Sequence, residues 1–291
     1  MTVEAEVASR RYPFHHGRET TISYPVTGAG VTTRVVESGS GDNVLVCLHG
    51  AGSRADRWVP AMPGLVEAGF RVLAIDFPGH GFAEKSADID YSAAGFAAVI
   101  AGVLDTLGLS GVTIAGTSLG GHVAAYLAVE RPDLVSGLVL IGAVGIGDFP
   151  QEFHTPAEVL SDGSIAGVQR KLSFLVSDPA MVTDAWVREE SMINSSTGAF
   201  DALSRIAGWL DTECNDARQD SKLAELLPEL PVLLVWGADD LWTPPSMGVS
   251  AQQNLPGVEL ELMPNCGHAP YFEDPDLFVE LMIKHGVGAR R

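Results

Sequence analysis

The chain has 291 residues, of which 46% are hydrophobic and 19% are charged, and its formal net charge is -19 at pH 7. This length and composition suit an α/β domain with a sizeable core and an insertion. The negative charge repels phosphate backbones and anionic lipid surfaces, which argues against nucleic-acid and membrane partners.

The three cysteines are widely spaced and form no C-x-x-C pair, so neither a disulfide framework nor a zinc site is expected. Cys47 lies in an apolar run and is predicted to be a small core residue. The adjacent pair His15-His16 has no carboxylate partner nearby, and no metal site is inferred from it. Because the N-terminal residues also lack an apolar signal region, the sequence predicts a cytoplasmic protein.

Apolar runs alternate with helix-spaced patterns along most of the chain, which predicts a mostly parallel sheet with crossover helices. A helix is expected from a cap at Ser92 to Leu107, with Gly108 as its end. Another amphipathic helix is expected at 276–284. The predicted strands are 20–24, 32–36, 44–48, 70–75, 112–115, 138–141, 232–236 and 258–262.

This alternation stops between about residues 144 and 228, where segments 180–191 and 199–210 carry apolar residues at helical spacing. The chain is therefore predicted to form a core from residues 1–143 and 229–291, with a helical cap at 144–228. The aromatic residues of this segment favour a pocket that is more apolar than charged. The cap residues proposed to line it are Trp186, Arg188, Glu190 and Trp209.

Gly116-Thr117-Ser118-Leu119-Gly120 stands between a strand-like run and the helical stretch 121–131. A G-x-S-x-G sequence at a strand-to-helix turn is typical of a nucleophile elbow. The glycines are needed because the turn is tight and larger side chains would collide with the neighbouring strand and helix. Ser118 is therefore the predicted nucleophile.

A serine hydroxyl needs a nearby base, and that base needs a carboxylate to orient it. His268 follows the last predicted strand, at the sheet edge where catalytic groups converge, and is the predicted base. His285 ends the closing helix and is interpreted as a surface or C-terminal helix residue. Asp239 and Asp240 directly follow strand 232–236 and are both candidates for the acid, with Asp148 as a third choice.

A tetrahedral intermediate also needs two N–H donors directed at its oxyanion. The predicted donors are the backbone amides of Leu119, directly after the nucleophile, and Ala51, in the glycine-rich loop after strand 44–48. Three further histidines, His49, His80 and His122, are predicted to be structural.

These motifs resemble the α/β-hydrolase family, whose order they follow: His49-Gly50-Ala51-Gly52, the stretch 76–81, the elbow, Gly237-Ala238-Asp239-Asp240 and the stretch 267–275. The resemblance implies an eight-stranded, mostly parallel sheet with a helical cap between the sixth and seventh strands. It also implies a cofactor-free hydrolase, and its G-x-x-D spacing selects Asp240 as the acid.

Serine at the elbow argues against haloalkane dehalogenases and epoxide hydrolases, which place aspartate there. The stretch 177–184 resembles the cap of meta-cleavage product hydrolases, which cut carbon–carbon bonds in ring-fission dienoates. The chain departs from them twice. Ala269 stands where they typically have tryptophan, and Glu190 falls where their cap presents an arginine, which leaves Arg188 or Arg205 as substitutes.

The sequence therefore predicts a serine hydrolase that cleaves an ester or lactone of a small, fairly apolar molecule through an acyl-enzyme. The alternative is carbon–carbon hydrolysis of a dienoate. An alternative of another class is a small-molecule receptor on a hydrolase fold, against which the complete triad argues. The predicted partner is a small-molecule substrate, and homo-oligomer formation is left open.

Overall fold

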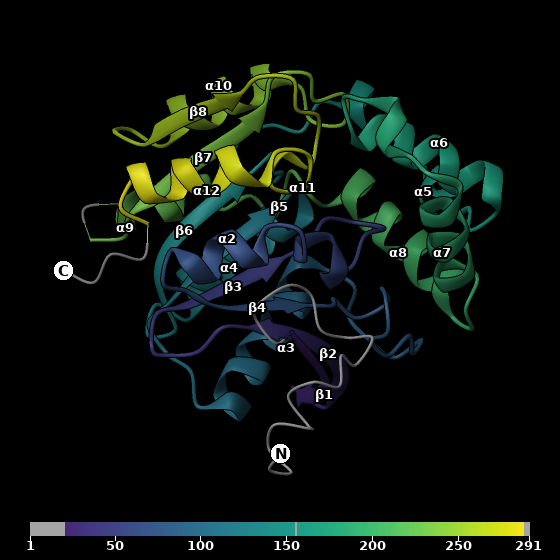
Figure 1. Ribbon diagram of the computed structural model, residues 1–291, viewed down its shortest axis with the longest axis horizontal. Helices are drawn as coiled ribbons and strands as arrows, with labels where there is room; N and C mark the ends of the chain where they lie inside the picture. Colours follow the sequence, from purple (N-terminus) through teal and green to yellow (C-terminus); the bar gives the residue numbers. More distant parts are fainter. Residues whose placement is uncertain (1–20, 155, 228, 288–291) are drawn as a thin grey trace, which may run out of the picture.

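The computed structural model describes residues 21–154, 156–227 and 229–287, and Figure 1 shows their arrangement. The pair His15-His16 lies outside the described residues. Within the described ranges, no helix is both long enough and apolar enough to span a membrane.

Eight strands form one sheet in the order β1-β2-β4-β3-β5-β6-β7-β8. The β2 strand runs antiparallel to both of its neighbours, and the remaining pairs are parallel. The predicted fold class is thus confirmed, and each expected strand is present, β3 with the predicted bounds and the others with one or both ends shifted. Their bounds are β1 (Ile22–Gly28), β2 (Val31–Ser38), β3 (Val44–Leu48), β4 (Arg71–Ile75), β5 (Val112–Thr117), β6 (Val135–Ile141), β7 (Val232–Gly237) and β8 (Glu259–Met263).

Helices cover both faces of the sheet because the central strands bury side chains on each side. In β3, Val46 and Leu48 point into one core, whereas Leu45 and Cys47 point into the other. The first core packs against α3 (Ala93–Leu107), α4 (Leu119–Glu130) and α10 (Pro245–Asn254). The second packs against the turn η1 (Ala55–Trp58), α2 (Met62–Glu67), α11 (Pro270–Glu273) and α12 (Pro275–Lys284).

Helix α3 begins and ends where local signals predict. The Ser92 hydroxyl accepts a hydrogen bond from Gly95 N, and Gly108 ends the helix with φ 66°. A left-handed backbone at the C-terminal position favours glycine because glycine has no Cβ to clash.

The described residues between β6 and β7 form helices joined by turns and loops and no strand, as expected for a helical insertion. Figure 1 shows α5 to α8 gathered at one side of the sheet. The division of the chain at residues 144 and 228 remains a prediction. The elements are η2 (Gln151–Phe153), α5 (Ala157–Ser161), α6 (Ile165–Leu175), η3 (Pro179–Met181), α7 (Asp184–Asn194), α8 (Ala199–Thr212) and α9 (Asp220–Leu226).

Candidate active site

Ser118 occupies a strained turn between β5 and α4, with φ 55° and ψ -119°. A non-glycine residue in this region costs about 1–3 kcal/mol, so the surrounding structure must enforce the turn. A Cβ on Gly116 would lie 2.3 Å from the carbonyl oxygen of Gly120, and one on Gly120 would lie 2.6 Å from that of Leu48. These close backbone contacts explain why the elbow needs glycines.

His268 and Asp240 form a buried pair, with 2.8 Å between His268 Nδ1 and Asp240 Oδ2. Because a carboxylate accepts hydrogen bonds, Nδ1 must carry the proton, and Nε2 is left with the lone pair that a base needs. The other oxygen of Asp240 accepts from the backbone N–H groups of Trp242 and Thr243, at 2.8 and 2.9 Å. Asp239 is exposed, and so is Asp148, which contacts Arg218.

Ser118 and His268 line the same cavity, so the structure brings all three predicted triad members to one place. Among the described residues, no hydrogen bond joins Ser118 Oγ to the imidazole. Such bonds are often long or absent in a free enzyme and shorten when substrate binds. Ala51 also lines this cavity, and Leu119 is the first residue of α4, where its N–H has no intrahelical acceptor.

Thr243 is a contact of the triad that the sequence reasoning missed. Its hydroxyl lies 2.9 Å from Asp240 Oδ2, 3.2 Å from His268 Nδ1 and 3.0 Å from the carbonyl oxygen of Gly142. These contacts fix the positions of the carboxylate and the imidazole relative to each other. The Asp-x-x-Thr spacing after β7 is the signal that could have found it, since an aspartate often accepts from the backbone N–H three residues later.

The loop that carries His268 is bound to the end of cap helix α6. His268 N donates to the carbonyl oxygen of Leu175 at 2.8 Å. Glu273 accepts from Gly267 N at 2.9 Å and from Ser177 N at 2.6 Å. The position of the imidazole therefore depends on the cap as well as on the sheet.

The four cap residues predicted to line the pocket do not line this cavity, which corrects the sequence interpretation. Glu190 is buried against arginines of the core, Trp186 packs on one of the same guanidinium groups, and Arg188 is exposed. Trp209 packs beside His122, with 5.5 Å between ring centroids. Helical spacing identifies which residues of a helix are buried, but not which element buries them.

The cap side of the cavity is formed instead by α5, α6 and α8, through residues that include Leu160, Leu172 and Leu210. Two cationic side chains, Arg57 and Lys171, join these apolar ones. The cavity is therefore largely apolar, as expected, but it also contains charges that the sequence did not reveal. Arg205, the other suggested substitute for a cap arginine, donates instead to the carbonyl oxygen of Ala87 at 2.6 Å.

Arg57 is balanced by Glu190, with 2.7 Å between Nη2 and Oε1, and Trp186 covers its guanidinium at 4.2 Å. Glu190 also contacts Arg54 Nη1 at 2.9 Å, so one carboxylate serves two arginines. Lys171 donates to the carbonyl oxygen of Leu160 at 2.9 Å, and burial lowers its pKa to about 8.

The three histidines predicted to be structural are buried away from the triad chemistry. Burial lowers the pKa of His49 and of His80 to about 3, and that of His122 to about 4. His49 Nε2 accepts a hydrogen bond from Phe77 N at 2.9 Å, which requires the neutral ring. This contact fixes the start of the loop that carries Ala51.

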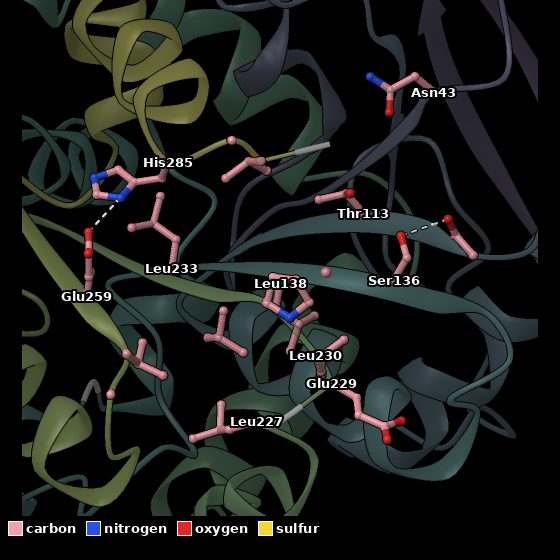
Figure 2. Close-up of a pocket in the computed structure, with 18 of the residues that line it drawn as sticks. Asn43, Thr113, Ser136, Leu138, Leu227, Glu229, Leu230, Leu233, Glu259 and His285 are labelled. Carbon is pink, nitrogen blue, oxygen red and sulfur yellow. Dashed lines mark hydrogen bonds and ion pairs between the residues drawn. The ribbon is translucent and has the colours of Figure 1, made fainter. Parts of the chain in front are cut away.

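A larger groove lies at the opposite edge of the sheet, where the parallel strands begin (Figure 2). His285 lies there, 2.7 Å from Glu259 and 2.6 Å from Glu261. The groove contains none of the residues predicted to act in catalysis. Active sites of parallel α/β sheets form at the carboxyl ends of the strands, so the cavity beside Ser118 is the better candidate.

Comparison with known proteins agrees with this fold. Residues 43–275 match the family described as the alpha/beta hydrolase fold, and the chain belongs to that family.

The similar proteins include two hydrolases and a phospholipase. A 2-hydroxy-6-oxononadienedioate/2-hydroxy-6-oxononatrienedioate hydrolase of a Pseudomonas species is 30% identical over 268 residues, which cover 86% of this chain and 89% of the relative. The solved meta-cleavage product hydrolase CumD of Pseudomonas fluorescens is 24% identical with a TM-score of 0.80, covering 92% of this chain and 98% of that one. A solved membrane phospholipase A is 25% identical with a TM-score of 0.82, covering 93% and 87%.

Proposed function

We propose that this protein hydrolyses a carbon–carbon bond next to a ketone in a conjugated, acidic substrate of the meta-cleavage type. The observation that carries the proposal is the similarity to the dienedioate hydrolase over nearly the whole length of both chains. The cavity fits such a substrate, because Arg57 and Lys171 lie among apolar side chains beside Ser118.

In the first half of the proposed reaction, Ser118 Oγ attacks the ketone carbon while His268 Nε2 takes the hydroxyl proton. Asp240 stabilises the imidazolium through Nδ1, and the amides of Ala51 and Leu119 stabilise the oxyanion. The carbon–carbon bond then breaks. Its electron pair is delocalised into the conjugated system of the leaving fragment, and His268 returns the proton to that fragment.

In the second half, His268 activates a water molecule that attacks the acyl-enzyme, and Ser118 is released as the hydroxyl. The water supplies OH to the acyl product and, in the net reaction, H to the leaving carbon. The reacting form is the keto tautomer of the dienol, R–CO–CH₂–R′, because its CH₂ carbon can pass the electron pair into the conjugated fragment. It gives the acid R–COOH and the product CH₃–R′. The triad and the oxyanion donors would act identically on an ester, and only the leaving group differs.

Hydrolysis of an ester or lactone, which the sequence put first, is the second candidate. The similarity to a protein named as a membrane phospholipase A favours it, and so does Ala269, which stands where the resemblance to dienoate hydrolases expects tryptophan. Both candidates use the same acyl-enzyme, so substrate tests must separate them.

The test is a comparison of coloured 2-hydroxy-6-oxo-dienoates with a panel of nitrophenyl esters, using the purified protein. We expect rapid bleaching of a dienoate and slower release of nitrophenol. Ser118→Ala should lower kcat by about 10⁶ on both. Ester turnover without bleaching would overturn the first candidate in favour of the second. Stoichiometric labelling by a fluorophosphonate without turnover of any substrate would favour the receptor alternative.

A further inference from the structure

Lys171 is the cavity cation that forms no direct ion pair with a carboxylate of the described residues, although the charges of Glu190 and Asp162 act on it from farther away. Arg57, the other cavity cation, lies 2.7 Å from Glu190. Within the part of the chain that the structure describes, no carboxylate lies within 4.0 Å of Lys171 Nζ. Its ammonium donates a hydrogen bond to the carbonyl oxygen of Leu160, and the residue is only 8% exposed.

An isolated buried ammonium is unfavourable unless its donors are satisfied. The Lys171 ammonium has three N–H donors, and the Leu160 carbonyl oxygen accepts from one of them. The two remaining donors belong to a side chain that lines the cavity beside Ser118. A bound anion would satisfy them and would balance the charge.

A second, independent polar group lies in the same cavity. The hydroxyl of Ser53 is buried, has no hydrogen-bond partner among the residues that the structure describes, and lines the cavity together with Lys171. The two residues are linked through Leu160, because a Cβ on Gly52 would lie 2.9 Å from Leu160 Cδ1. The residue that binds the ammonium thus packs against the loop that contains Ala51 and Ser53.

We propose that Lys171 binds a carboxylate of the substrate and thereby makes the enzyme prefer acidic substrates over neutral ones. Ser53 Oγ is a further donor for the same group. The inference deepens the proposed function and rests on it for the reacting bond. A lysine of cap helix α6 then supplies the positive charge, while Glu190, from α7, is occupied by Arg54 and Arg57.

The test compares Lys171→Met with the wild type on two pairs of substrates that differ in one charge. The first pair is a coloured dienoic acid and its methyl ester. The second is the mono-nitrophenyl ester of glutaric acid and nitrophenyl pentanoate, which are hydrolysed whether or not the enzyme cleaves carbon–carbon bonds. In Lys171→Met, kcat/KM on the acidic substrates should fall about 10- to 100-fold, mainly because KM rises, since a hydrogen bond between charged groups is lost. The neutral partners should change less than about threefold.

Arg170→Met is the matched control, because Arg170 is the adjacent residue of α6 and its side chain is 55% exposed. It should leave the preference for acids unchanged, and Lys171→Arg should retain most of that preference. Equal losses on acidic and neutral substrates in Lys171→Met would overturn the inference. If no dienoate is bleached but the glutarate ester depends on Lys171, the reacting bond is misassigned and the anion site stands.

Discussion

Glu190 compensates two buried arginines, so neutralising it tests how the cap is held on the core. Its carboxylate oxygens lie 2.7 Å from Arg57 Nη2 and 2.9 Å from Arg54 Nη1, and the three side chains are 3%, 5% and 6% exposed. At an effective dielectric constant of ~20, each contact contributes roughly 6 kcal/mol of Coulomb attraction, most of which offsets the desolvation of the ions. Removing one partner of such a cluster typically costs about 3–5 kcal/mol, because the remaining charges stay buried. We expect Glu190→Gln to lower the free energy of unfolding by that amount.

Glu189 provides the control, because it is the adjacent residue and contacts Arg54 at 3.0 Å but is 61% exposed. An exposed ion pair contributes at most about 1 kcal/mol. Thermal unfolding followed by circular dichroism should therefore show Glu190→Gln melting roughly 5–8 °C below the wild type, and Glu189→Gln within about 2 °C of it. Equal melting temperatures for the two variants would refute the argument that burial makes Glu190 essential.

Other predictions concern the elbow, the triad and the buried histidines. Gly120→Ala should abolish activity and lower the yield of folded protein, since its Cβ would lie 2.6 Å from two carbonyl oxygens. Gly208→Ala is the control: a Cβ there has nothing within 4 Å, so this variant should not lower the melting temperature. Thr243→Val should lower kcat about fivefold with KM unchanged and shift the pH profile of kcat, because it removes one hydrogen bond at the Nδ1 side of His268. Burial lowers the pKa of His122 to about 4, so between pH 6.5 and 4 the unfolded chain binds a proton that the folded chain does not. Stability should therefore fall with falling pH by about 1 kcal/mol per pH unit from this group, and His122→Asn should flatten that slope in pH-dependent melting curves.

The features that the sequence predicts correctly depend on neighbouring residues in the chain. The helix from Ser92 to Gly108 is bounded by its own cap and its own left-handed glycine. The elbow likewise needs only a strand, two glycines and a helix in succession. The strand positions follow from apolar runs that are buried on both faces of a parallel sheet. Most strand ends differ from the prediction, because pairing with neighbouring strands extends β1 and β6 beyond the predicted ranges.

The residues that the sequence misplaces depend on contacts between distant segments. Glu190 meets Arg57 across 133 positions of the chain. Neither residue type predicts burial, because charged side chains are seldom buried unless they are paired. Lys171 was missed for the same reason, since a lysine on an amphipathic helix is usually exposed. A pocket lined by buried cations such as Arg57 and Lys171 can be recognised only after it is known which segments pack against each other.

The charge of the cavity is opposite to the charge of the whole molecule. A protein with a formal net charge of -19 repels an acidic molecule at long range, but salt at physiological concentration screens that repulsion beyond about 8 Å. Inside the cavity the screening is much weaker, and the ammonium of Lys171 acts at short distance in a medium of low polarity. Any preference for an acidic substrate must therefore arise from a few buried cations rather than from the surface. Because Glu190 compensates Arg57 and also contacts Arg54, the single charge of Lys171 has a larger effect on this preference than the number of arginines near the site would suggest.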